Sequence, residues 1–123
     1  MMTVQETAAL LRQQDHILIL THRRPDGDTI GCAAGLCAAL RQLGKEAFVL
    51  FNSEATATNR VYAEPYWAPE DFAPDFVVSV DVAARNMFFP AAEAYQDRVD
   101  LAVDHHPSQE FFAKETCLDA SRA

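Results

Sequence analysis

The sequence of 123 residues has few cysteines and few basic residues. The three cysteines, Cys32, Cys37 and Cys117, are odd in number and show no Cys-x-x-Cys spacing, which argues against a disulfide framework or a redox pair. Lys and Arg number 10 against 18 Asp and Glu, so the formal net charge is −8. This balance argues against a broad basic surface for long nucleic acid, and a polyanionic substrate would need cations to mediate its contact.

Long hydrophobic runs and targeting signals are also missing. No apolar stretch approaches the roughly 20 residues that span a bilayer, and the amino terminus lacks the charged and then apolar regions of a signal peptide. We therefore expect no membrane segment and a location in the reducing cytoplasm. With half of its residues hydrophobic and no internal repeat, the chain is expected to form one domain over residues 1–123.

Two segments show the apolar spacing of a helix. The first is 4–14, where Thr3 and Glu6 have the spacing of a capping box. The second is 29–43, with Asp28 as the expected N-cap and Gly44 as the stop. A weaker helical pattern covers 86–96, and the proline-punctuated segment 52–74 predicts a long connection with at most one short helix.

Short apolar runs typical of buried strands alternate with these helices. They cover 17–20, 47–51, 76–80 and 99–103. The alternation predicts an α/β fold with a largely parallel, doubly wound sheet and helices on both faces.

Acidic and histidine side chains follow three of the predicted strands. They are His22, Asp26 and Asp28 after the first strand, Asp81 after the third, and Asp104, His105 and His106 after the fourth. Ligands of such sheets bind outside the carboxyl ends of the strands, so we expect these three segments to meet at one edge. Mixed imidazole and carboxylate ligands suit Mn²⁺, Zn²⁺, Fe²⁺ or Co²⁺.

The number of aspartates indicates more than one cation. Asp26, Asp28, Asp81 and Asp104 would repel one another unless divalent ions neutralised them. Two ions about 3.5 to 4 Å apart activate a water and clamp a phosphoryl group, so the expected reaction is hydrolysis of a phosphoester or phosphoanhydride. His106 could then donate a proton to the leaving oxygen.

Ordinary structural roles compete with these interpretations. A single aspartate after a strand usually caps a helix or faces solvent, and only the convergence of three segments favours metal. His16 precedes a strand, has no acidic partner nearby and is given no function. Four aromatic residues could stack on a base, but packing of the long connection is the favoured role of Tyr62, Tyr66, Trp67 and Phe72.

The three clusters resemble the motifs of the DHH phosphoesterase superfamily. The first motif corresponds to His22-Arg23-Arg24-Pro25-Asp26-Gly27-Asp28-Thr29-Ile30-Gly31, the second to Asp81 and the third to Asp104-His105-His106. The superfamily includes RecJ exonucleases, nano-RNases that also dephosphorylate 3′-phosphoadenosine 5′-phosphate (pAp), and family II inorganic pyrophosphatases. The first motif and the alanine-rich helix after it are most similar to the nano-RNase and pAp phosphatase branch.

The resemblance implies a centre with two Mn²⁺ ions. The implied ligands are His22, Asp26 and Asp81 for one ion, and Asp28, Asp81 and His105 for the other. Asp104 would orient the site and His106 would be the acid. The implied substrates are short oligonucleotides or nucleotide phosphates such as pAp. A pyrophosphatase or polyphosphatase of the same superfamily, and a non-catalytic module that binds metal or nucleotide, are the alternatives.

Two parts of the family pattern are missing from this sequence. Family members carry a fourth motif with a metal-binding aspartate and then a smaller substrate-binding domain, whereas this sequence stops at Ala123. The resemblance thus implies an amino-terminal part of a longer enzyme, with an incomplete second metal site and low activity alone. We expect a helix to begin in 118–123, and Asp119 is not assigned as a ligand. Whether the chain folds alone or as a homodimer is left open.

Overall fold

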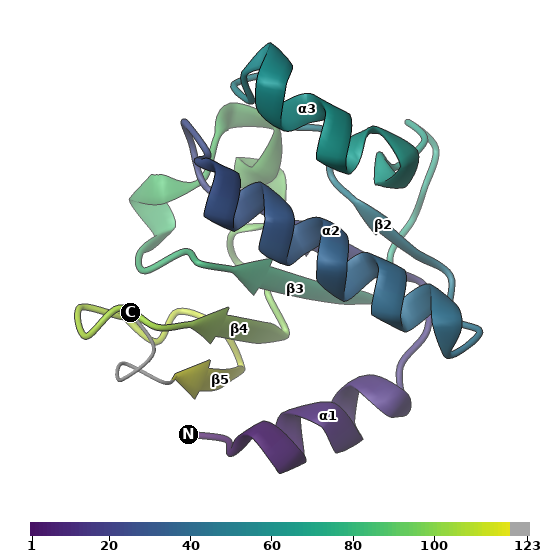
Figure 1. The fold of residues 1–123 in the computed structure, drawn as a ribbon. Helices are drawn as coiled ribbons and strands as arrows, with labels where there is room; N and C mark the ends of the chain where they lie inside the picture. Colours follow the sequence, from purple (N-terminus) through teal and green to yellow (C-terminus); the bar gives the residue numbers. More distant parts are fainter. Residues whose placement is uncertain (119–123) are drawn as a thin grey trace.

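The chain folds around a parallel sheet, seen in a computed structural model that describes residues 1–118 (Figure 1). The five strands are β1 (Ile17–Leu20), β2 (Ala47–Val49), β3 (Phe76–Val80), β4 (Leu101–Asp104) and β5 (Glu115–Leu118). They lie in the order β2-β1-β3-β4-β5, and all four pairings are parallel. The predicted α/β fold is confirmed.

Helices cover both faces of the sheet. They are α1 (Val4–Arg12), α2 (Gly27–Gln42), α3 (Ala57–Ala63) and the 3-10 helices η1 (Glu64–Tyr66), η2 (Arg85–Met87) and η3 (Pro90–Tyr95). Helices α1 and α2 pack on one face and the η2–η3 segment on the other, while α3 packs against α2 (Figure 1). No helix within residues 1–118 is long and apolar enough to cross a membrane.

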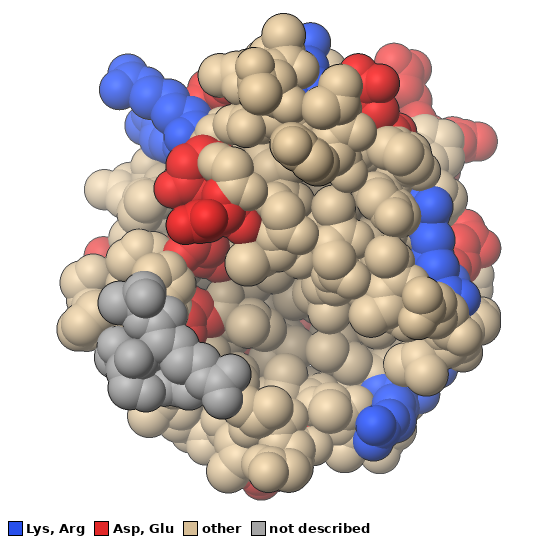
Figure 2. Space-filling model, viewed as in Figure 1, with Lys and Arg blue, Asp and Glu red and all other residues tan. Residues whose placement is uncertain are grey.

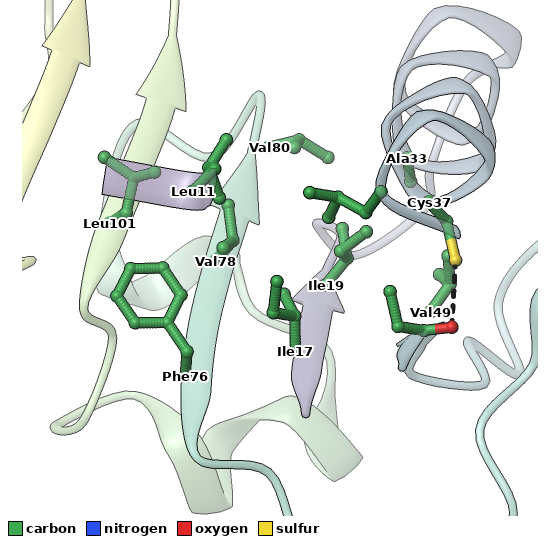
Figure 3. Packing of buried hydrophobic residues seen from close by; sticks show 12 residues of the cluster. Leu11, Ile17, Ile19, Ala33, Cys37, Val49, Phe76, Val78, Val80 and Leu101 are labelled. Carbon is green, nitrogen blue, oxygen red and sulfur yellow. Dashed lines mark hydrogen bonds between the residues drawn. The ribbon is translucent and has the colours of Figure 1, made fainter. Parts of the chain in front are cut away.

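Alternating side chains of the central strands fill two core layers. Ile17 and Ile19 of β1 face α1 and α2, whereas Leu18 and Leu20 face the opposite layer. Figure 3 shows the first layer, in which the Cys37 thiol donates a hydrogen bond to the carbonyl oxygen of Ala47 at 3.2 Å. Burial on both faces explains why β1 and β3 appear in the sequence as unbroken apolar runs.

Helix α2 begins two residues before the predicted start. Its N-cap is Asp26, whose backbone is extended (φ −87°, ψ 178°) and whose carboxylate accepts the Thr29 N–H at 2.8 Å. The prediction of Asp28 as the cap was therefore wrong, because Asp28 lies inside the first turn. The predicted stop is found where Gly44, with φ +80°, follows the last turn.

The weak helical pattern over 86–96 forms two 3-10 helices instead of an α-helix. Phe88 and Phe89 between them are extended and fully buried against the sheet. Pro90 disfavours a helical conformation at the residue before it, which separates the two turns. The short helix predicted in the long connection is α3.

The carboxyl-terminal strands differ from the prediction. Strand β4 lies later than predicted, so Asp104 is its last residue. Strand β5 was not predicted, because Glu115 and Thr116 interrupt any apolar run. It pairs with β4, and the Met2 N–H donates to the Thr116 carbonyl at 2.8 Å on its other side. The helix predicted over 118–123 is wrong at Leu118, which ends β5; Asp119 and the rest lie outside the described residues.

Candidate metal centre

The carboxyl edge of the sheet brings most of the predicted site residues together. Ligand atoms within 4.8 Å of one another form two groups, which are His22, Asp26 and Asp81, and Asp81, Asp104, His105 and His106. Asp81 belongs to both groups. Asp28 belongs to neither, and instead lines a pocket beside them.

Asp81 lies at the middle of this arrangement. It follows β3 directly in the left-handed region, with φ +62°, and its N–H donates to the Val103 carbonyl at 2.9 Å. This conformation costs roughly 1–2 kcal/mol for most residues and is best tolerated by Asn and Asp. It turns the Asp81 carboxylate toward residues that follow β1 and β4.

One oxygen of Asp81 is buried without a hydrogen bond in the described part of the chain. Its Oδ2 accepts the Thr29 hydroxyl at 2.6 Å, whereas Oδ1 has no donor. His105 Nε2 lies 2.7 Å from Oδ1, but not in the direction of a hydrogen bond. An imidazole nitrogen and a carboxylate oxygen at this spacing fit two ligands that share a cation.

The carboxylates of this edge lack basic partners. Within residues 1–118, the basic side chains within 4.0 Å of the Asp81 and Asp104 carboxylates are histidines, which carry charge only when protonated, and no lysine or arginine pairs with either. Burial penalises a charged carboxylate unless a cation compensates it. The residues present therefore fit a divalent metal ion.

The ring of His22 is oriented for a ligand role. Its Nδ1 lies 2.7 Å from the carbonyl oxygen of Arg23, which can only accept, so Nδ1 carries a proton. In the neutral ring this leaves a lone pair on Nε2, which lies 3.6 Å from Asp81 Oδ2. A carbonyl that fixes the tautomer in this way is typical of metal-binding histidines.

Thr29 contacts all three members of the first group, a role that the sequence did not indicate. It is fully buried, and its hydroxyl lies 2.7 Å from His22 Nε2 and 2.6 Å from Asp81 Oδ2, so its single proton serves one of these two acceptors at a time. Its backbone N–H is the main reason that the pKa of Asp26 lies below the usual carboxyl value. In the sequence, the available signal for this role of Thr29 was its position as a polar residue on the predicted apolar side of the helix, directly after Asp28.

Asp104 and His106 form the second contact pair. Their Oδ1 and Nδ1 atoms lie 2.6 Å apart, and the Asp104 side chain is fully buried. Because an ionised carboxylate only accepts, Nδ1 carries the proton and Nε2 is the ring nitrogen left for other chemistry. The second side-chain partner of Asp104 is Gln109, a buried residue that the sequence did not single out.

A pocket of about 520 Å³ opens beside the two groups. Its acidic end is formed by Asp28, Asp81, Asp104 and His105, and mostly apolar side chains of α1, α2, β3, β4 and β5 form the rest. Figure 2 shows this hollow as a surface poor in charged atoms with acidic side chains at one rim. Burial, followed by the charge of Asp81, raises the pKa of the Cys32 thiol on the same wall.

His16 lies at the opposite edge of the sheet and is not isolated. Its Nδ1 lies 3.0 Å from Asp75 and its Nε2 lies 3.6 Å from Glu46, so the expectation that it lacks acidic partners was wrong. Among the aromatic residues, Trp67 packs edge-on against Phe51 and Phe72 against Phe48, as expected for packing, whereas Tyr62 is 62% exposed, so the packing role predicted for it was wrong.

Comparison with known proteins agrees with this geometry. The model of the DHH family N-terminal domain matches residues 16–122. The chain is 32% identical over 111 residues to the bifunctional oligoribonuclease and PAP phosphatase NrnA of Thermus thermophilus, a match that covers 87% of this chain and 33% of that protein.

A solved structure shows the same fold. It is an exopolyphosphatase-related protein from Bacteroides fragilis, with a TM-score of 0.76 at 20% sequence identity, and the match covers 94% of this chain and 38% of the other. The chain spans about a third of the length of the Thermus relative described above. The family match over residues 16–122, together with the parallel sheet, shows that the chain belongs to the DHH family, whose N-terminal domain it contains.

Proposed function

We propose that the chain supplies the metal centre of a phosphoesterase that hydrolyses short oligonucleotides or nucleotide phosphates such as pAp. The observation that carries this proposal is Asp81, whose carboxylate is shared by both ligand groups and has a buried oxygen without a donor. The substrate class is supported by the Thermus relative, which is named for oligoribonuclease and PAP phosphatase activities.

The proposed ligands divide between two ions, with Mn²⁺ as the expected metal. His22, Asp26 and Asp81 would hold one ion, in agreement with the first group of ligand atoms. Asp28, Asp81 and His105 would hold the other, although Asp28 stands apart in the structure. When bound, the ions supply positive charge that stabilises the transferred phosphoryl group and acidify a nearby water.

His106 is the proposed general acid. Asp104 holds its Nδ1–H, so a proton on Nε2 is the one available for transfer to the leaving oxygen. About a third of the His106 side chain is exposed, which gives a substrate access to the ring. In this scheme Asp104 acts through His106 and does not contact the substrate.

The experiment is a comparison of three substrates in the presence of Mn²⁺. Release of mononucleotide from a dinucleotide and of phosphate from pAp is measured against hydrolysis of pyrophosphate, with Asp81→Asn as the inactive control. We expect the two nucleotide substrates to be preferred. Faster hydrolysis of pyrophosphate would assign the chain to the pyrophosphatase alternative. Metal binding without hydrolysis of any substrate, both in this chain and in a longer protein that contains it, would favour a binding module.

A further inference from the structure

Gln109 is a buried amide in the loop that follows Asp104-His105-His106. Only 6% of the residue is exposed, and each hydrogen of its side-chain NH₂ group has a partner. Nε2 donates to Asp104 Oδ2 at 2.8 Å and to the Val82 carbonyl at 3.0 Å. Its Oε1 accepts the Phe111 N–H at 2.9 Å.

These contacts fix the plane of the Asp104 carboxylate. One oxygen of Asp104 faces His106 and the other accepts from Gln109. The terminal torsion of an aspartate is soft, so a single anchored oxygen would leave the carboxylate free to rotate. Because the Asp104 side chain is fully buried, water cannot readily replace the amide.

The same amide joins the ends of two strands. The Val82 carbonyl belongs to the residue after Asp81, and Asp104 ends β4. On its other side Gln109 holds Phe111, which has an unfavourable φ of +57°. Gln109 thus sets the position of the loop relative to Asp81 and Asp104.

We propose that Gln109 is a positioning residue that holds Asp104 and, through it, the ring of His106. This inference rests on the proposed function, in which His106 is the acid. If Gln109 only stabilised the loop, its contacts with Val82 and Phe111 would be sufficient and the hydrogen bond to Asp104 would not be required.

The test variant is Gln109→Met, which keeps the length of the side chain and removes its hydrogen bonds. Phe89→Leu is the matched control, because Phe89 is fully buried in the layer with η2 and η3, and its truncation destabilises the fold without touching Asp104. Thermal unfolding of both variants shows whether a change in the site follows from lost stability alone.

The first readout is the proton NMR spectrum of the metal-free chain, which needs no activity. We expect a downfield Nδ1 proton from His106, assigned by its loss in His106→Gln, that shifts or disappears in Gln109→Met and persists in Phe89→Leu. An unchanged resonance in Gln109→Met would overturn the proposal. So would the lack of the resonance in the unmodified chain, since there would be no bond for Gln109 to hold.

The second readout is kinetic and uses the substrate found in the assay above. We expect Gln109→Met to lower kcat by about 10- to 100-fold with little change in KM. Asp104→Asn should lower kcat as well. The kcat of the double variant should be little lower than that of Asp104→Asn, since both substitutions break the same series of hydrogen bonds from Gln109 through Asp104 to His106. Additive losses would overturn the proposal. If the unmodified protein neither binds Mn²⁺ nor hydrolyses any of the substrates, the proposed function fails while the NMR result still decides the role of Gln109.

Discussion

Both edges of the sheet place a histidine beside carboxylates, yet the two clusters differ in burial. At the amino edge, the side chains of His16, Asp75 and Glu46 are 46%, 75% and 52% exposed. At the carboxyl edge, those of Asp81 and Asp104 are 14% and 0% exposed. Solvent screens the first cluster, whereas the second has buried negative charge without lysine or arginine partners in the described residues.

The comparison shows that residue type alone does not define a metal centre. His16 and Asp81 both have a left-handed backbone, with φ +50° and +62°, so backbone strain does not separate the clusters either. The difference comes from three segments that converge at the carboxyl ends of parallel strands.

The largest expected effect separates the two edges directly. Asp81→Asn removes the charge shared by both ligand groups and should abolish metal binding and hydrolysis. Asp75→Asn at the amino edge should leave both unchanged. Mn²⁺ content measured after dialysis checks this, and equal losses in the two variants would mean that the carboxyl edge has no special role.

The next effect concerns the roles of the adjacent histidines. His106→Gln should lower kcat by about 10²- to 10⁴-fold, the usual contribution of a general acid, while metal content is preserved. His105→Gln should instead lower metal affinity. If the metal is lost in His106→Gln and kept in His105→Gln, the two roles are exchanged.

Asp26 combines a helix cap with a proposed ligand role, and two substitutions separate them. Asp26→Asn keeps a good cap and should preserve the stability of the metal-free chain, whereas Asp26→Ala should cost about 1 kcal/mol. Both should weaken Mn²⁺ binding. Calorimetric titration and thermal unfolding measure the two effects, and a stable Asp26→Asn variant with unchanged affinity would exclude Asp26 as a ligand.

The lowered pKa of Asp26 adds a pH dependence to this comparison. The cap bond favours the ionised carboxylate, so its contribution to stability is present above the ordinary carboxyl pKa and is lost as the pH falls through the lowered value. The stability advantage of the unmodified chain over Asp26→Ala should therefore shrink in acid. Metal-free samples unfolded at neutral and acidic pH check it, and a constant difference would contradict the assigned cap.

The smallest effect is expected at the amino edge. His16→Asn removes two exposed contacts with carboxylates and keeps a residue that tolerates positive φ. Its free energy of unfolding should change by no more than about 0.5 kcal/mol, without any effect on Mn²⁺ binding. A loss of several kcal/mol in denaturant titrations would show that exposure is a poor guide to the strength of this cluster.

Sequence patterns predicted the parts of the fold that local physics determines. Strands β1 and β3 were predicted at their observed limits because burial on both faces gives an unbroken apolar run. Strand β5 lacks such a run and owes its conformation to its partner β4. The convergence of the motifs was predicted from the rule that ligands bind at the carboxyl ends of parallel strands.

The supporting residues of the site could not be predicted in the same way. Thr29 matters because it contacts Asp81, which is distant from it in sequence. Gln109 matters because the chain turns back after His106 and brings its amide to Asp104. The observed N-cap is Asp26 and not the predicted Asp28, because the backbone is extended at Asp26 and helical from Gly27 on, which the sequence alone did not reveal.

The most direct measurement is a calorimetric titration of this chain with Mn²⁺, repeated for Asp81→Asn and Asp75→Asn. We predict binding of one or two ions that is lost in Asp81→Asn and unchanged in Asp75→Asn. A chain that binds no Mn²⁺, or binds it equally well without the Asp81 carboxylate, would contradict the metal centre described above.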